Sequence, residues 1–241
     1  MKSISDTLII IPARMESKRF PGKPLVNING KTMLEHVRDR AIESGAGKVV
    51  VACCDKEIKI FLEKKNIFYI WTKKNLNSGT DRVNFAFEKI KNRGKYKYVI
   101  NLQGDVPFIK YKDIIKLKTL IKNSPFKIAT LISEIKNKNH VKDPNIVKAV
   151  ISKYNHKYYE ALYFSRSPIP YNAEKYYEHV GIYAYTKLAL KKFVSLGKSN
   201  LEKQEKLEQL RALENNMRIA VQKISNAPVS IDIPEDLNRL K

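Results

Sequence analysis

The sequence has only two cysteines, Cys53 and Cys54, and they are adjacent. Neighbouring side chains on a strand point to opposite faces, so this pair suits neither a disulfide nor a shared metal site. We expect both to be small buried side chains of the run VVVACC. Without a disulfide framework, the chain fits a reducing compartment.

Long apolar runs are also missing, and none approaches the length of a transmembrane helix. The first residues, MKSISDTLIIIPAR, have neither the apolar length nor the small-residue cleavage site of a signal peptide. We therefore expect a cytoplasmic protein with no membrane association.

Acidic residues are scarce, with 24 against 46 basic residues, which gives a formal net charge of +22. Such a charge attracts any anion, including nucleic acid and acidic metabolites. Only ten of the basic residues are arginine, and they are scattered. Proteins that bind nucleic acid rely on bidentate arginine contacts or on basic patches interleaved with aromatic residues. A solvated, lysine-rich surface is the better interpretation, and a nucleic-acid binder is the weaker alternative.

Hydrophobic runs alternate with helical patterns through the first half of the chain. The spacing predicts strands over 7–13, 48–54, 67–72, 96–104 and 126–135, and helices over 31–45, 55–66, 78–92 and 111–123, with Asp55 as a plausible N-cap. Strand–helix alternation of this kind favours an α/β fold with a parallel-rich sheet and helices on both faces. The later part predicts strands over 146–152, 161–166, 179–186 and 218–224, and helices over 186–197, 201–216 and 234–241.

The domain organisation follows from the same patterns. We expect one domain over 1–241, with a core at about 7–135 and 215–241. A subregion at about 136–214, for dimerisation or lid movement, would return to that core. No repeat or linker interrupts the chain.

The first predicted strand runs into PARMESKRFPGKP, a stiff basic loop. Neither GxGxxG nor GxxxxGK[ST] occurs. Still, Arg14, Arg19 and Lys23 can neutralise a polyphosphate, and the backbone near Gly22 can approach phosphate oxygens closely. By composition alone, a phosphate grip and a solvated basic turn are equally good interpretations.

Two further stretches, NLQGD and SGTDR, lie just after predicted strands, at whose carboxyl ends α/β sheets bind ligands. With the basic loop, they should therefore converge at one edge of the sheet. Asp105 in NLQGD suits Mg²⁺ or a simple Gly-Asp turn. Asp232 in VSIDIPEDL is a charge among apolar neighbours that needs a partner or a metal. Ser78 and Thr80 in SGTDR open a predicted helix, either as an anion site or as its cap. Asp236 and Glu235 are typical of a first helical turn.

Five polar side chains stand in apolar patterns later in the chain: Arg166, His179, Glu208, Gln209 and Arg211. His179 alone is more typical of a satisfied core histidine than of a ligand. Glu208 and Arg211, at i and i+3, could form an ordinary ion pair on a helix surface.

The order of the motifs is more specific than any one of them. PAR…PGKP, SGTDR, NLQGD, DPNIVK, ALYFSRSPIP, HVGIY, LEQLR and DIPEDL together resemble the 3-deoxy-manno-octulosonate (Kdo) cytidylyltransferase family over about residues 8–240. The resemblance implies a nucleotide-diphospho-sugar transferase (Rossmann-like) fold with a mixed, mostly parallel sheet, and a homodimer. It also implies the reaction of CTP and Kdo to CMP-Kdo and pyrophosphate with Mg²⁺, for lipopolysaccharide biosynthesis.

The resemblance also implies roles for individual residues. Arg14, Arg19 and Lys23 would hold the CTP phosphates, with Arg14, Lys23 and Asp105 as the catalytic set. The other implied groups are Ser78, Gly79, Thr80 and Gln103 for the nucleotide; Gln103, Arg166, His179, Glu208 and Gln209 for the sugar acid; and Asp105 and Asp232 for Mg²⁺.

Because of three departures from the family pattern, the identity of the sugar substrate stays open. Val106 stands where the family usually has Glu, Leu76 stands where it has His, and the segment 171–178 is short. A cytidylyltransferase for another ulosonic acid, such as 8-amino-Kdo or a sialic-like acid, and a noncatalytic relative are the alternatives.

Overall fold

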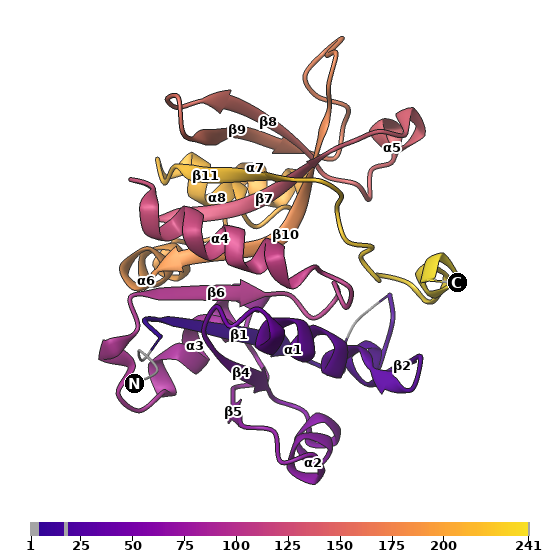
Figure 1. The fold of residues 1–241 in the computed structure, drawn as a ribbon, viewed down its shortest axis with the longest axis vertical. Helices are drawn as coiled ribbons and strands as arrows, with labels where there is room; N and C mark the ends of the chain where they lie inside the picture. Colours follow the sequence, from indigo (N-terminus) through magenta and orange to yellow (C-terminus); the bar gives the residue numbers. More distant parts are fainter. Residues whose placement is uncertain (1–4, 17–18, 241) are drawn as a thin grey trace. The chain divides into compact units, whose positions relative to one another are not determined.

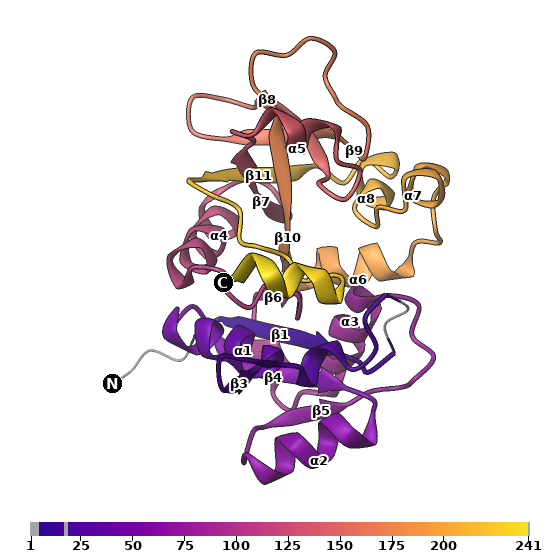
Figure 2. The same ribbon diagram turned by 90° about the vertical axis from the view of Figure 1, so that its right-hand side faces the viewer.

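The computed structural model describes residues 5–16 and 19–240, and the chain forms two compact units (Figures 1 and 2). The first unit comprises Met1–Ile115 and Pro228–Lys241, and the second comprises Lys116–Ala227. Helix α4 (Tyr111–Asn123) runs across the division. The single-domain organisation predicted from the sequence stays a prediction.

The sheet of the first unit is entirely parallel. Its strands lie in the order β5 (Tyr69–Trp71), β4 (Lys48–Cys53), β1 (Thr7–Ala13) and β6 (Tyr98–Leu102). The four side chains from Leu8 to Ile11 are fully buried. Because successive side chains on a strand point to opposite faces, both faces of the sheet are covered there.

Strand β1 has β4 on one side and β6 on the other, so the strand order reverses at β1. The strands are connected through α1 (Met33–Glu43), α2 (Lys56–Lys64), α3 (Gly79–Lys89) and η2 (Arg93–Lys95). Helix α1 begins with a capping box between Thr32 and Glu35. The loops after β1, β4 and β6 all leave from the carboxyl edge of this sheet, where α/β folds bind ligands.

Short elements complete the first unit. The loop after β1 leads into the 3₁₀ helix η1 (Lys23–Leu25) and the hairpin β2 (Asn27–Ile28) and β3 (Lys31–Thr32). The chain ends in the 3₁₀ helix η3 (Pro234–Leu240).

The second unit has a mixed sheet in the order β10 (Tyr177–Thr186), β7 (Ile128–Glu134), β11 (Ile219–Ile224), β9 (Tyr159–Ser165) and β8 (Lys148–Lys153). Only β7 and β11 pair in parallel. Its other helices are α5 (Lys138–Lys142), α6 (Lys187–Ser195), α7 (Asn200–Glu205) and α8 (Leu210–Glu214). The predicted parallel majority is therefore wrong for this unit.

Two helix predictions are wrong in detail. The helix expected over 201–216 is divided into α7 and α8, because Lys206 adopts a left-handed conformation with φ 56°. The helix expected over 234–241 is a 3₁₀ helix over the residues that the structure describes. The remaining predicted strands and helices are confirmed, with shifts at their ends. In the described part of the chain, no helix combines the length and the apolar character that crossing a membrane requires.

Cys53 and Cys54 are both free and buried, as expected. Burial, with smaller contributions from Cys54 and Asp55, raises the pKa of the Cys53 thiol to about 12. The thiolate is the reactive form of cysteine, so Cys53 is a packing residue.

Candidate active site

Lys23 lies between two carboxylates. Its Nζ is 3.6 Å from Asp105 Oδ2 and 3.4 Å from Asp232 Oδ1, and it donates a 2.7 Å hydrogen bond to the Ile231 carbonyl oxygen. Arg19 adds a second cation, with Nη2 3.1 Å from Asp232 Oδ1. The two aspartates are 127 positions apart in the sequence. Their predicted convergence is confirmed, whereas their role as metal ligands stays a prediction.

Backbone contacts hold the two aspartates at this place. Asp105 follows the carboxyl end of β6, and its carbonyl oxygen accepts a 2.9 Å hydrogen bond from the Ile231 N–H. The Asp236 carboxylate accepts from the N–H groups of Asp232 and Ile233, at 2.8 and 3.1 Å. Asp236 is therefore the capping residue that its position predicted. The Asp232 carboxylate remains available to the cations.

A small apolar cluster anchors the same segment. Phe20, Ile28, Met33 and Ile231 are buried together, although they come from the basic loop, the hairpin, α1 and the C-terminal segment. Ile231 directly precedes Asp232. Packing therefore joins the two parts of the chain that supply Lys23 and Asp232.

The charges of Asp105 and Asp232 are balanced by the ammonium group of Lys23. Desolvation raises the pKa of Asp105, Lys23 opposes this shift, and the neighbouring Asp232 adds to it. Two carboxylates so close together need a positive charge between them. Carboxylate oxygens are the hard donors that Mg²⁺ prefers. Among the described residues, no group of three or more His, Cys, Asp or Glu side chains could hold a metal. A metal at this pair would therefore take its remaining ligands from substrate and water.

The basic loop folds back on itself through Gly22. Its φ of 74° lies in the left-handed region, which glycine adopts without strain, and its N–H donates a 3.1 Å hydrogen bond to the Met15 carbonyl oxygen. This turn delivers Lys23 to the carboxylates. Arg14 is exposed and has no hydrogen-bond or ion-pair partner in the described part of the chain. The structure therefore brings Arg19 and Lys23 to the cluster, but not Arg14.

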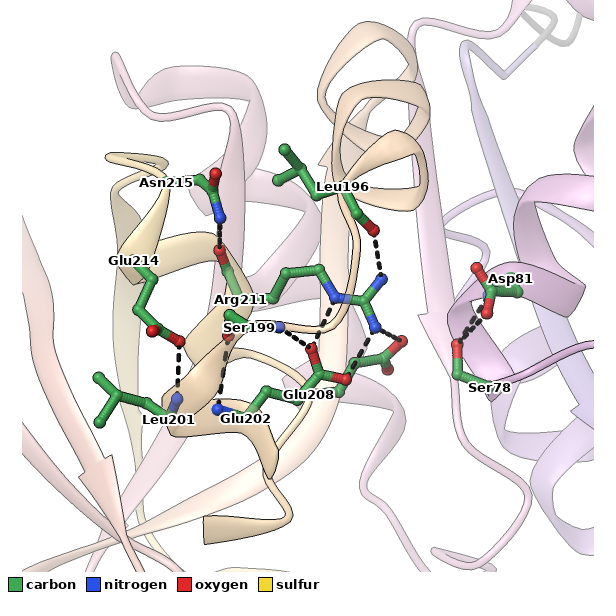
Figure 3. Close-up of polar contacts among 10 residues, drawn as sticks. All are labelled: Ser78, Asp81, Leu196, Ser199, Leu201, Glu202, Glu208, Arg211, Glu214 and Asn215. Atoms are coloured by element: carbon green, nitrogen blue, oxygen red, sulfur yellow. Dashed lines mark hydrogen bonds and ion pairs between the residues drawn. The ribbon is translucent and has the colours of Figure 1, made fainter. Parts of the chain in front are cut away.

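The SGT segment packs against Gln103. Ser78 caps α3, its Oγ accepting from the Asp81 N–H at 3.1 Å and lying 3.0 Å from Asp81 Oδ2 (Figure 3). A Cβ added to Gly79 would lie 3.2 Å from both amide atoms of Gln103. Glycine therefore allows α3 to approach the Gln103 amide.

Asn101 links these groups from inside the sheet. It is almost fully buried on β6, donates to Thr80 Oγ1 at 3.1 Å, and accepts from Gln103 Nε2 at 2.7 Å. Sequence reasoning did not select Asn101. The sequence feature that could have pointed to Asn101 is a single amide side chain in the apolar run YVINL, because a buried amide requires hydrogen-bond partners.

In the second unit, His179 lies on β10 among aromatic rings. Its ring centroid is 5.0 Å from that of Phe164 and 5.3 Å from that of Tyr183. Its Nε2 is 3.1 Å from Thr130 Oγ1, which also lies within hydrogen-bond distance of the Val180 and Ile182 carbonyl oxygens. The hydroxyl has a single proton and donates it to a carbonyl, so we assign the proton of the imidazole to Nε2. Nδ1 is then an acceptor.

We expect His179 to make the protein less stable in mild acid. Burial lowers its pKa from 6.5 to about 3. The unfolded chain therefore takes up a proton that the folded chain does not. The stabilisation is complete above pH 6.5 and is lost as the pH falls towards 3. Replacing His179 with Phe should reduce the loss of unfolding free energy between about pH 6.5 and about pH 5 by up to about 2 kcal/mol.

Urea unfolding at the two pH values measures this difference. Burial also raises the pKa of Glu178 to about 6, with the opposite effect on stability, but both proteins carry that residue. Equal pH dependence in the wild type and the His179→Phe variant would contradict the assignment of a neutral His179.

Arg166 is held by backbone carbonyls. Its Nε donates to the Glu205 carbonyl oxygen at 2.9 Å and its Nη1 to the Pro144 carbonyl oxygen at 2.8 Å. The Glu205 carboxylate in turn accepts from the Arg166 N–H at 2.9 Å and the Ser165 hydroxyl at 2.6 Å. These bonds fix the guanidinium and use part of its donor capacity.

Arg211 forms a buried ion pair, which corrects the surface pair considered from the sequence. Its Nε and Nη2 each lie 2.8 Å from a carboxylate oxygen of Glu202, whereas Glu208 lies at 4.0 Å (Figure 3). The side chains of Arg211 and Glu202 are 3% and 8% exposed. In a continuous helix, residues nine positions apart would be separated by about 13 Å along the axis. The break at Lys206 is what brings them together.

Gln209, two positions before Arg211, is buried, and its Nε2 has no hydrogen-bond partner within the described ranges. A buried amide donor without a partner is costly. Gln209 is therefore suited to meeting a ligand oxygen.

A family model described as cytidylyltransferase matches residues 8–219. The 3-deoxy-manno-octulosonate cytidylyltransferase of Paramagnetospirillum magneticum is 40% identical over 235 residues, covering 97% of this chain and 96% of the relative. That of Brucella anthropi is 43% identical over 237 residues, covering 98% and 95%. The chain belongs to the 3-deoxy-manno-octulosonate cytidylyltransferase family.

Solved structures agree with this membership. CMP:2-keto-3-deoxy-manno-octonic acid synthetase, complexed with CTP, superposes with a TM-score of 0.89 at 36% identity, covering 98% of this chain and 97% of that one. The 4-diphosphocytidyl-2C-methyl-D-erythritol synthase of Anaerococcus prevotii, at 14% identity and a TM-score of 0.63, shares the fold. The family and the nucleotide-diphospho-sugar transferase fold expected from the motifs are both confirmed.

The residues that depart from the family pattern differ in how far they are buried in this cytidylyltransferase. Val106 is buried, with 4% exposure, and belongs to the apolar core. Leu76 is half-buried in the segment that leads to Ser78, and Tyr171 is 98% exposed. Neither Val106 nor Leu76 can supply a charged or hydrogen-bonding side chain at its position.

Proposed function

We propose that the protein transfers CMP from CTP to the sugar acid Kdo and releases pyrophosphate, as a 3-deoxy-manno-octulosonate cytidylyltransferase. The observation that carries the proposal is the meeting of Asp105, Asp232 and Lys23 at the carboxyl edge of the first unit's sheet. Such an edge is where α/β folds hold nucleotides. Membership of the family supplies the reaction.

The basic residues would bind the triphosphate. Arg19 and Lys23 already lie at the carboxylates, and Arg14 extends from the same loop with its guanidinium uncommitted. The anomeric hydroxyl oxygen of the sugar bonds to the α-phosphorus and its proton passes to water, while the bond from that phosphorus to the bridging oxygen breaks and pyrophosphate leaves. Phosphoryl transfer of this kind requires in-line positioning and neutralisation of charge on the phosphate oxygens. No covalent nucleophile is needed.

Asp105 and Asp232 would hold Mg²⁺. Their oxygens are suitable donors, and Lys23 shows that a positive charge between them is accommodated. When bound, the metal would polarise the attacking hydroxyl and neutralise the phosphates. The protein's own part is to keep both carboxylates fixed, through Ile231 and Asp236.

The remaining site residues divide by unit. Ser78, Gly79, Thr80 and Gln103 would line the nucleotide, with Asn101 orienting the Gln103 amide. In the second unit, His179 Nδ1 would accept a hydrogen bond from a sugar hydroxyl, and Gln209 Nε2 would donate a hydrogen bond to a sugar oxygen. Arg166 and Glu208 complete the proposed sugar contacts. A homodimer, expected from the resemblance, stays a prediction.

The test is to identify the product. The protein is incubated with CTP, Mg²⁺ and one sugar acid at a time: Kdo, 8-amino-Kdo or a sialic acid. We expect the mass of CMP-Kdo from the Kdo reaction, and much less product from UTP or GTP. Product from another sugar acid but not from Kdo would keep the mechanism and change the substrate. No nucleotide sugar from any of them would overturn the proposal.

A further inference from the structure

Asp55 stands at the carboxyl end of β4, next to the end of β1, and its carboxylate is used in an unusual way. The residue occupies the N-cap position of α2, as its sequence context predicted, but its side chain makes no capping hydrogen bond. An N-cap aspartate usually stabilises its helix by accepting a hydrogen bond from a backbone N–H of the first turn. Here that contribution is forgone.

The carboxylate turns to the basic loop instead. Asp55 Oδ2 accepts a 2.9 Å hydrogen bond from the Met15 N–H and a 3.3 Å contact from Cys54 Sγ. Met15 lies two positions after Ala13, the last residue of β1, and Ala13 pairs with Cys53 of β4. A hydrogen bond from a backbone N–H to a carboxylate is charge-assisted and stronger than a neutral one.

The Met15 peptide is held on both sides. Its N–H donates to Asp55, and its carbonyl oxygen accepts the 3.1 Å hydrogen bond from the Gly22 N–H. Gly22 precedes Lys23, which lies between the two site aspartates. A continuous series of contacts therefore leads from Asp55 through Met15 and Gly22 to the ammonium group.

We propose that Asp55 is a positioning residue for triphosphate binding. It fixes the first turn of the basic loop and thereby the place from which Arg14 and Lys23 meet the phosphates. This inference rests on the proposed function of the loop. Its carboxylate acts through the Met15 N–H and not by contact with the phosphates.

Two substitutions separate the loop contact from the helix start. Serine at position 55 is a good N-cap, but its hydroxyl is too short to replace the carboxylate at Met15. Asparagine keeps an oxygen acceptor of the same reach. We expect Asp55→Ser to raise the KM and the Kd for CTP about tenfold or more, with little change in the KM for the sugar acid. Asp55→Asn should stay within about threefold of the wild type.

The controls are Asp39→Ser and Lys23→Ala. Asp39 is a surface carboxylate of the same unit, ion-paired with Lys31 on an exposed face, and its loss should not change CTP binding. Lys23→Ala should weaken CTP binding if the loop is the phosphate grip. Calorimetric titration with CTP alone gives Kd, and thermal unfolding reports on folding.

The outcomes are distinct. Weakened CTP binding in Lys23→Ala together with unchanged binding in Asp55→Ser would overturn the role of Asp55 and leave the proposed function standing. Unchanged CTP binding in Lys23→Ala would overturn the phosphate grip, and the role of Asp55 with it. If Asp55→Ser lowers kcat, the CTP affinity and the melting temperature together, and Asp55→Asn does not restore them, Asp55 is a structural residue only.

Discussion

Replacing Asp232 with Asn should lower kcat/KM for CMP-Kdo formation roughly 10²-fold or more, and Asp105→Asn should do the same. The two carboxylates are the proposed metal ligands, and each lies within 3.6 Å of Lys23 Nζ. Asparagine keeps the shape of the side chain but removes the negative charge that would hold a divalent cation beside the triphosphate. The effect should therefore appear in the rate rather than in the folding of the protein.

Steady-state pyrophosphate release over a range of CTP concentrations, at saturating Kdo, gives kcat/KM, and the series is repeated at several Mg²⁺ concentrations. Asp39→Asn is the matched control, since it removes a carboxylate from the surface of the same unit. We expect it to keep the wild-type rate. A rate within about threefold of the wild type for either site variant would contradict a role as metal ligand.

The second large effect concerns stability. Replacing Glu202 with Gln should lower the unfolding free energy by about 3–5 kcal/mol, because the buried guanidinium of Arg211 loses the nearer, hydrogen-bonded of its carboxylate partners. Both side chains are almost fully buried, and the pair is bidentate. Arg211 also stacks on Phe193, with its Cζ 4.9 Å from the ring centroid, so it cannot move out to water without losing packing.

Urea unfolding of the single variant and of the double variant Glu202→Leu, Arg211→Met tests this account. Buried ion pairs can often be replaced by apolar side chains at little cost, so we expect the double variant to recover most of the lost stability. A single variant that loses less than about 1 kcal/mol would contradict a tightly coupled pair. Glu208→Gln is the matched control, because Glu208 is farther from Arg211.

The secondary structure of several segments could be predicted because their local patterns agree with their packing. The run TLIIIPA is a strand over the predicted residues, and YKDIIKLKTLIKN is a helix over the predicted residues. The division of the 201–216 helix could not be predicted. Neither glycine nor proline marks the break at the left-handed Lys206, and the buried pair of Glu202 with Arg211 joins residues from either side of it.

The candidate site was predictable only in part. Single motifs gave weak signals, and the ordered set of motifs that resembles the family brought Lys23, Asp105 and Asp232 together. Asn101 gave only the weak signal of a single amide in an apolar run, and the contact of Asp55 with Met15 gave none. Both depend on which strands are neighbours, and the Asp55 contact joins residues 40 positions apart. Local sequence showed a helix cap at Asp55, and only the packed sheet shows that its carboxylate has another use.

The central claim is that this chain joins CMP to Kdo at the carboxylate–lysine cluster. The most direct measurement is the rate of pyrophosphate release from CTP by the wild-type protein, with and without Kdo and with and without Mg²⁺. We predict release only when both are present. Release that does not depend on Kdo, or no release when CTP, Mg²⁺ and Kdo are all supplied, would contradict the account.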